Sequence, residues 1–420
     1  MTLTDSPPDV FHLSREAAAE RDRVDPLASC RDLFLLPADV LYFDGNSLGP
    51  LTRAARERVR EVTERQWGED LVRSWNLHGW IDLPRRVAAK IAPLVGAAAD
   101  EIAVTDSTSV NLFKLLAAAL ALRPERRVIL SETAQFPTDL YMIQGLAELL
   151  DGRCEPRLVE PEGLLEALDD DVAAVCLSHV RYKDSTLLDM AAVNRAARGR
   201  GALTVWDLSH SAGALAVDLE GCGADFAVGC GYKFLNGGPG APAFVYVARR
   251  HQEAARTPLA GWLGHEDPFL FDLDYRPAPG VERFLCGTPP VIALAALDAA
   301  LDAFAGVDLA ALRAKSVALG DLFLELLRRR CPQVGIACPE DGRRRGSHLA
   351  LSHPEGYAVV QALVARGVVC DFRPPDVMRF GLAPLYLRYA DVWDAAAALA
   401  DVLETRAWDD PRFRRRGKVI

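Results

Sequence analysis

Two charged residues in the middle of the chain, Asp207 and Lys233, have sequence neighbours that are more typical of an active site than of an exposed surface. Asp207 ends the apolar run at 203–206, and Lys233 is followed by the glycine-rich stretch at 237–240. Ligands of α/β folds bind at the carboxyl ends of strands, where the carboxylate of Asp207 could keep a pyridine nitrogen protonated. The amine of Lys233 could form an imine with an aldehyde. The pair therefore indicates pyridoxal 5'-phosphate, with Lys233 as its Schiff-base lysine.

A second polar segment, just before residue 110, could bind a phosphate group. Thr108 and Ser109 place two hydroxyls directly before an apolar run with helical spacing. The first N–H groups of a helix and its dipole favour an anion, so both residues are candidate phosphate contacts. The alternative is that these hydroxyls only cap the helix, and the sequence leaves both interpretations open.

These residues need a fold that brings the ends of several strands together. From about residue 100, short apolar runs that predict strands alternate with helical stretches. Such alternation is typical of a mainly parallel sheet covered by helices on both faces, which makes the fold class α/β. The predicted strands cover 101–104, 128–130, 172–177, 203–206, 226–228 and 244–247, and the predicted helices cover 51–66, 110–122, 138–150 and 189–198.

A smaller unit follows the large one. The alanine- and leucine-rich stretch at 291–305 predicts a linking helix. Beyond it, the pattern predicts an α+β unit with helices at 309–329, 357–366 and 391–406 and strands at 348–352, 368–372 and 378–381. We therefore expect an N-terminal segment (1–50), a large α/β domain (51–306) and a small C-terminal α+β domain (307–420).

The composition narrows the class of partner. The net charge of −10 argues against nucleic acid or an anionic membrane, so we expect a small-molecule substrate. Nine cysteines without a C-x-x-C pair favour a reducing compartment, and the first 27 residues lack the apolar run of a signal peptide. We therefore expect a cytoplasmic location. The eight histidines form no H-x-x-x-H pair, so no metal site is expected.

Seven phrases in a fixed order resemble the kynureninase family of pyridoxal-phosphate enzymes. The resemblance covers about residues 40–390 and implies an aspartate aminotransferase-like fold of type I. It also implies hydrolysis of L-kynurenine, and more weakly of 3-hydroxy-L-kynurenine, to anthranilate and L-alanine in tryptophan catabolism or NAD biosynthesis. The phrases are FDGNSLG (43–49), TSVNL (108–112), FPTD (136–139), DLSHSAG (207–213), GYKFLNGGPG (231–240), GWLGH (261–265) and GTPP (287–290).

The resemblance implies roles for single residues as well. Lys233 would hold the cofactor and move protons, Asp207 would pair with the ring nitrogen, and Tyr232 would relay a proton beside the phosphate. Arg379 would grip the substrate α-carboxylate with its two-pronged guanidinium. Further cofactor contacts would be Thr108, Ser109, Phe136, Thr138, Asp139, Ser178 and His210, with Trp262 and Thr288 supplied by the partner in a homodimer that shares its active sites; further substrate contacts would be Trp75 and Asn46.

Two other readings stay open on the residues alone. A cysteine desulfurase or an aminotransferase would share the fold, and a desulfurase would need a nucleophilic cysteine on a mobile loop, for which Cys331 and Cys338 are the candidates. A binding or regulatory protein could also keep the fold without catalysis. Such a protein would have no physical need for Lys233, Asp207 and Arg379 together.

Overall fold

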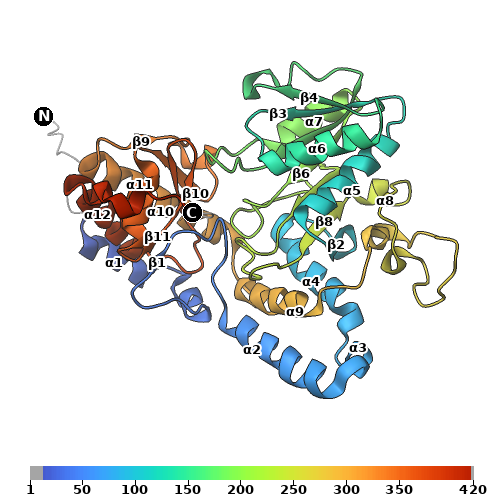
Figure 1. Cartoon of the computed structure of the whole chain (residues 1–420), viewed down its shortest axis with the longest axis horizontal. Helices are drawn as coiled ribbons and strands as arrows, with labels where there is room; N and C mark the ends of the chain where they lie inside the picture. Colours follow the sequence, from blue (N-terminus) through green and yellow to red (C-terminus); the bar gives the residue numbers. More distant parts are fainter. Residues whose placement is uncertain (1–12, 418–420) are drawn as a thin grey trace, which may run out of the picture.

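A seven-stranded sheet forms the centre of the larger part of the molecule, on the right in Figure 1. The structure is a computed structural model that describes residues 13–417. Four neighbouring strand pairs are parallel, and only β8 runs antiparallel to both of its neighbours, which confirms the mainly parallel sheet. From edge to edge the order is β2 (Ile102–Thr105), β8 (Ala243–Val247), β7 (Phe226–Gly229), β6 (Leu203–Asp207), β5 (Val172–Ser178), β3 (Val128–Glu132) and β4 (Glu155–Val159).

Helices cover both faces of this sheet, which explains why its inner strands are short runs of wholly buried residues. On one face lie α5 (Thr108–Ala121) and α6 (Pro137–Leu149). On the other face lie α4 (Leu83–Ile91) and α7 (Met190–Gly199), with α9 (Val291–Ala300) packed on α4. A short α8 (Arg249–Gln252) follows the last strand.

An extension leaves the body of the protein along α2 (Arg53–Glu61), which packs on α9. A π-helical segment, Val62–Asp70, continues it toward α3 (Ser74–Leu77), and α3 lies at the far end of this extension in Figure 1. Sequence periodicity predicted one regular helix over 51–66. The α-helix ends instead at Glu61, because the backbone continues as a π-helix.

The smaller part contains an antiparallel sheet in the order β12 (Asp371–Arg373), β13 (Val377–Gly381), β10 (His348–Ser352) and β9 (Gly335–Ile336). Its helices are α10 (Leu309–Arg330), α11 (Gly356–Val364) and α12 (Tyr389–Glu404), which agrees with the predicted α+β unit. The division of the chain at residues 50 and 306 stays a prediction.

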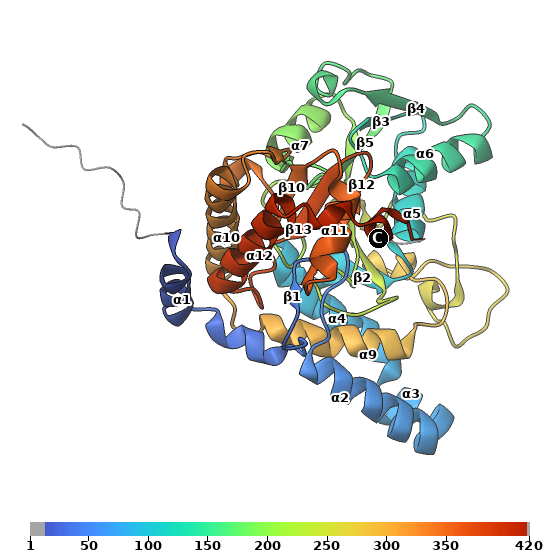
Figure 2. The ribbon, with the colours of Figure 1, turned by 60° about the vertical axis from the view of Figure 1, so that its left-hand side comes forward.

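The described N-terminal residues join the smaller part. α1 (Arg15–Arg23), at the left edge of the ribbon in Figure 2, packs on α12, and β1 (Leu41–Tyr42) pairs in parallel with β11 (Val368–Val369). This pairing fixes the loop after β1, at residues 43–49, against β13, since the Gly381 N–H donates to the Phe43 carbonyl. Within residues 13–417, no helix combines the length and hydrophobicity that a membrane span requires.

Candidate active site

Two buried carboxyl groups meet near the end of the central strands. Ser178 and Asp207 are the last residues of β5 and β6 and face each other in register. Gln135 links this edge to Asp139: its Nε2 donates to the Asp139 carboxyl over 2.6 Å, and its Oε1 accepts from the Ser178 N–H over 2.8 Å. Burial, followed by the charge of Asp207, raises the pKa of Asp139 well above its ordinary value. A cation placed here would be stabilised.

Lys233 lies beside a neutral imidazole and two aromatic rings. Its Nζ is 3.4 Å from Nε2 of His210 and within 6 Å of the ring centroids of Phe136 (5.9 Å) and Tyr232 (5.8 Å). Burial, followed by the charge of Lys233, lowers the pKa of His210 well below its ordinary value. Burial raises the pKa of the Tyr232 phenol. At neutral pH the phenol therefore keeps its proton, and the imidazole stays uncharged.

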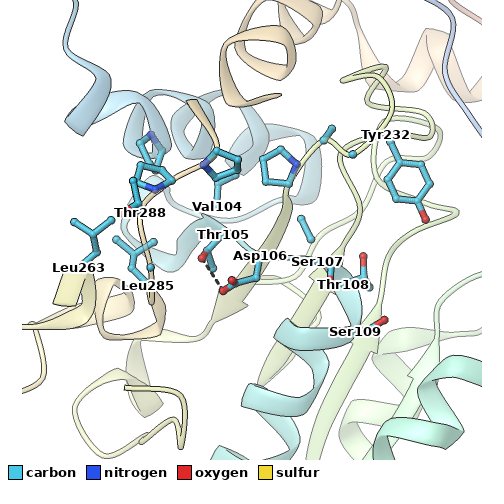
Figure 3. A pocket seen from close by; sticks show the side chains of 18 residues that line it. Val104, Thr105, Asp106, Ser107, Thr108, Ser109, Tyr232, Leu263, Leu285 and Thr288 are labelled. Carbon is cyan, nitrogen blue, oxygen red and sulfur yellow. Dashed lines mark hydrogen bonds between the residues drawn. The ribbon is translucent and has the colours of Figure 1, made fainter. Parts of the chain in front are cut away.

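The start of α5 forms one wall of a cavity of about 470 Å³. Figure 3 shows Thr108, Ser109 and Tyr232 at one end of this cavity and Thr288 at the other. Ser107 caps the helix by accepting the Val110 N–H, so capping does not occupy Thr108. The buried Oγ1 of Thr108 has no hydrogen-bond partner in the described part of the chain. A free hydroxyl at a helix N-terminus suits a phosphate group.

The residues present therefore fit pyridoxal phosphate. The carboxyl pair Asp139 and Asp207 suits a protonated ring nitrogen, the amine of Lys233 suits an aldehyde, and the start of α5 suits a phosphate. Phe136 is partly exposed, and its ring contacts Tyr182 edge to face at 5.1 Å between centroids. Nζ of Lys233 lies over this ring, 5.9 Å from its centroid, and the ring-stacking role that the sequence predicted for Phe136 stays a prediction.

Arg379 is buried in β13, and its planar fork is already occupied. Nε donates to Oδ1 of Asp371 over 2.7 Å, and Nη2 donates to Oδ2 of the same carboxylate. Nη1 donates to the Tyr182 carbonyl over 2.6 Å, and Nη2 also donates to the Ser47 hydroxyl over 3.2 Å. A guanidinium has five N–H donors, so one remains, on Nη1. In this arrangement one guanidinium N–H of Arg379 is left for a substrate carboxylate, and the two-pronged grip stays a prediction.

Asn46 lies next to the strand that carries Arg379. Its side chain is fully buried, and neither Nδ2 nor Oδ1 has a hydrogen-bond partner among residues 13–417. A Cβ added at Gly381 would lie only 2.2 Å from Oδ1 of Asn46, so glycine is required for this approach. The unpartnered amide suits contact with a ligand, as the sequence predicted for this residue.

Two of the predicted residues, Trp75 and Trp262, are not brought to this cluster within one chain. Trp75 lies in α3, where its ring packs edge to face on Trp80 at 5.6 Å, and it does not line the cavity at α5. Trp262 contacts Phe269 in a separate hollow. Thr138 is half-buried in the first turn of α6, next to Asp139. Trp75 and Trp262 would need a second subunit to reach a site.

Sequence reasoning missed Gln135, Asp371 and His348, all of which are buried among these groups. Gln135 directly precedes the phrase FPTD, which could have suggested it. Asp371 and His348 belong to no motif, and only the register of β10, β12 and β13 brings them to Arg379.

Comparisons with solved structures establish the fold class. Cysteine desulfurase CsdA from Escherichia coli superposes with a TM-score of 0.76 over 90% of this chain and 98% of that chain, at 19% identity. The cystine C–S lyase C-DES, solved with glycine covalently linked to its PLP cofactor, superposes with a TM-score of 0.75 over 87% of this chain and 97% of that chain, at 18% identity. These are fold type I pyridoxal-phosphate enzymes.

Comparisons with related sequences are more specific. Residues 312–399 match the family described as Kynureninase C-terminal domain. Kynureninase from Burkholderia mallei (strain SAVP1) is 51% identical over 413 residues, covering 97% of this chain and 99% of that protein. Kynureninase from Pseudomonas fluorescens is 48% identical over 405 residues, covering 95% and 97%. With such identity over nearly its whole length, the chain belongs to the kynureninase family.

Proposed function

We propose that this chain hydrolyses L-kynurenine, and more weakly 3-hydroxy-L-kynurenine, to anthranilate and L-alanine. The observation that carries the proposal is the position of Lys233 beside the neutral imidazole of His210, at the end of the sheet where Asp207 and Asp139 lie. Pyridoxal phosphate, when bound, supplies an electron sink that lets bonds at the substrate Cα and Cβ break. The reaction then adds water across the Cβ–Cγ bond.

Four side chains of this chain have separate roles in the reaction. The Asp207 carboxylate keeps a positive charge on the ring nitrogen, and the amine of Lys233 takes and returns the proton at the substrate Cα. Nε2 of His210 lies 3.4 Å from Nζ of Lys233, and a neutral imidazole with its proton on Nδ1 can accept a hydrogen bond from the amine. The Tyr232 phenol, which lines the phosphate cavity and keeps its proton, can donate to a developing negative charge.

The desulfurase alternative finds little support in the two candidate thiols. Cys331 and Cys338 are both buried. Burial raises the pKa of Cys331 to about 11 and also raises the pKa of Cys338. A nucleophilic cysteine needs the thiolate, which burial disfavours at neutral pH. Likeness to desulfurase structures therefore concerns the fold and not the reaction.

The direct test is to mix purified protein with L-kynurenine and follow anthranilate fluorescence. Lys233→Ala should abolish both this activity and the visible absorption band of the bound cofactor. Lys183→Ala, on the loop after β5, is the matched control and should leave both unchanged. A visible band that survives unaltered in Lys233→Ala would show that another residue holds the cofactor.

We further propose that the protein works as a homodimer in the cytoplasm. Large apolar side chains are exposed on the α2–α3 extension, such as Val72 (76%), and on the loop at 266–275, which precedes α9, such as Leu273 (100%). Thr288 lines both the phosphate cavity and an apolar groove of about 830 Å³ beside α2 and α9. A second copy that covers this groove would therefore also reach the cavity. All nine cysteines are unpaired, which suits a reducing compartment.

A further inference from the structure

His348 is a buried polar residue that none of the roles above uses. It begins β10, its side chain is fully buried, and within residues 13–417 neither ring nitrogen has a hydrogen-bond partner. Its ring centroid lies 5.6 Å from that of His210, which contacts Lys233. Polar groups removed from water normally find partners, yet the Tyr182 carbonyl that influences the pKa of this ring makes no hydrogen bond of normal geometry with it.

The register of the small sheet places His348 on the same face as Arg379. His348 lies opposite Gly381, and Ala350 lies opposite Arg379, in the antiparallel pair β10–β13. Directly opposed residues share a face, and so do residues two apart on one strand, so both side chains leave the sheet on the same side. This face also carries Asp371, which lies opposite Arg379 in β12, the other neighbour of β13.

The carboxylate site on this face is incomplete with Arg379 alone. Asp371, Tyr182 and Ser47 take four of the five guanidinium N–H groups. A substrate carboxylate has two oxygens, each of which accepts more than one hydrogen bond. Further donors must therefore come from neighbouring side chains that have no partner yet.

We propose that His348 completes the α-carboxylate site by donating a ring N–H to one carboxylate oxygen, while Asn46 donates from Nδ2. Burial, followed by the charge of Arg379, lowers the pKa of His348 to about 3, so the ring is neutral and carries one N–H. Gly381, which lies between the two residues, contacts Asn46 and faces His348 in register. This inference rests on the proposed function, since it names how that substrate is held.

The test compares His348→Leu with His348→Gln, which keeps a donor of similar reach. Loss of one hydrogen bond to a charged group should raise KM for L-kynurenine about 10- to 100-fold in His348→Leu, with kcat changed much less. His348→Gln should recover most of the loss. The inhibition constant of L-alanine should rise in parallel, whereas that of anthranilate should stay unchanged. His353→Leu, just past the end of β10 and in contact with Trp408, is the matched control.

Two outcomes overturn the proposal. One is an unchanged KM and unchanged L-alanine inhibition in a folded, cofactor-loaded His348→Leu. The other is an equal rise in the inhibition constants of L-alanine and anthranilate, which would indicate that His348 has only a structural role. If His348→Leu does not fold, His348→Phe, which also removes both ring nitrogens, replaces it under the same criteria. If the wild type fails to cleave L-kynurenine, the proposed function falls, and L-alanine binding read from cofactor absorbance still tests His348.

Discussion

Asp371 accepts hydrogen bonds from both Nε and Nη2 of Arg379, and both side chains are almost completely buried. Burial raises the pKa of Asp371, but the neighbouring guanidiniums of Arg379 and Arg373 and the Ser47 hydroxyl outweigh it, so the net pKa is lowered. The carboxylate therefore stays ionised and fixes the arginine before substrate arrives. The pairing fixes the orientation of the guanidinium and therefore also the direction of its remaining N–H, on Nη1.

Asp371→Ala should destabilise the protein by about 3–5 kcal/mol, because it leaves the buried charge of Arg379 without a partner. Urea unfolding followed by circular dichroism measures this loss. Asp341→Ala is the control, since its partner Arg343 is largely exposed and an exposed pair contributes far less to stability. Equal losses of unfolding free energy in the two variants would mean that the buried pair stabilises the protein no more than the exposed pair does.

Asp44 gives the stability of the protein a pH dependence. Burial, followed by the charge of Asp371, raises its folded-state pKa to about 7, whereas an unfolded aspartate has a pKa of about 3.9. The folded state therefore binds this proton more tightly, and the stability it contributes is lost as pH rises from about 4 to about 7. Asp44→Asn removes this loss.

The stability gain of Asp44→Asn over wild type should accordingly be about 2–3 kcal/mol larger at pH 8 than at pH 5. Urea unfolding of both proteins at the two pH values measures it. Asp376→Asn, in the turn between β12 and β13, serves as the control substitution. A gain of equal size at both pH values would contradict the raised pKa.

The sequence predicted the inner strands of the large sheet to within one or two residues, because each is a short apolar run. It did not predict β4 or α4. β4 is an edge strand in which exposed and half-buried residues alternate, and Pro156 weakens its strand signal. Asp371 and His348 were also missed, since nothing in the local sequence indicates which residues of separate strands become neighbours in the sheet.

The two carboxyl groups at the ring-nitrogen end should differ in their effect on catalysis. Asp207→Asn removes the charge proposed to hold the nitrogen protonated, and turnover should fall about 100-fold or more while cofactor stays bound. Asp139→Asn should cost much less, because burial and the charge of Asp207 raise the pKa of Asp139 and so favour its uncharged form. Steady-state kinetics with anthranilate detection compares them. A reversed order would assign the ring nitrogen to Asp139 instead.

Shared active sites predict complementation between two inactive variants. Lys233→Ala removes the cofactor lysine, and Trp262→Ala removes a residue that reaches no site in its own chain. A mixed dimer would contain one site with both residues intact, so mixing the two variants should restore part of the activity, up to about a quarter of the wild-type level at random exchange. No recovery after proven subunit exchange would argue against shared sites.

The last prediction concerns substrate choice: kcat/KM should be higher for L-kynurenine than for 3-hydroxy-L-kynurenine. Burying a hydroxyl without a partner costs about 1–3 kcal/mol, which corresponds to about 5- to 150-fold in kcat/KM. Trp75 would present an apolar ring edge to the substrate, and the short Thr288 reaches less far than a longer polar side chain. Since α3 lies far from the Lys233 cluster of its own chain, Trp75 can act this way only at the partner's site.

Trp75→His should therefore reduce the preference for L-kynurenine, because an imidazole nitrogen can accept a hydrogen bond from the 3-hydroxyl group of the other substrate. Trp80→His is the control, since Trp80 packs edge to face on Trp75 and its indole donates to Gln66 instead of facing a ligand. If Trp75→His and Trp80→His shift the ratio of kcat/KM equally, the effect comes from disturbing α3 and not from the pocket. Equal kcat/KM values for the two substrates in the wild type would refute the pocket argument and leave the family assignment untouched, because that assignment rests on the whole chain.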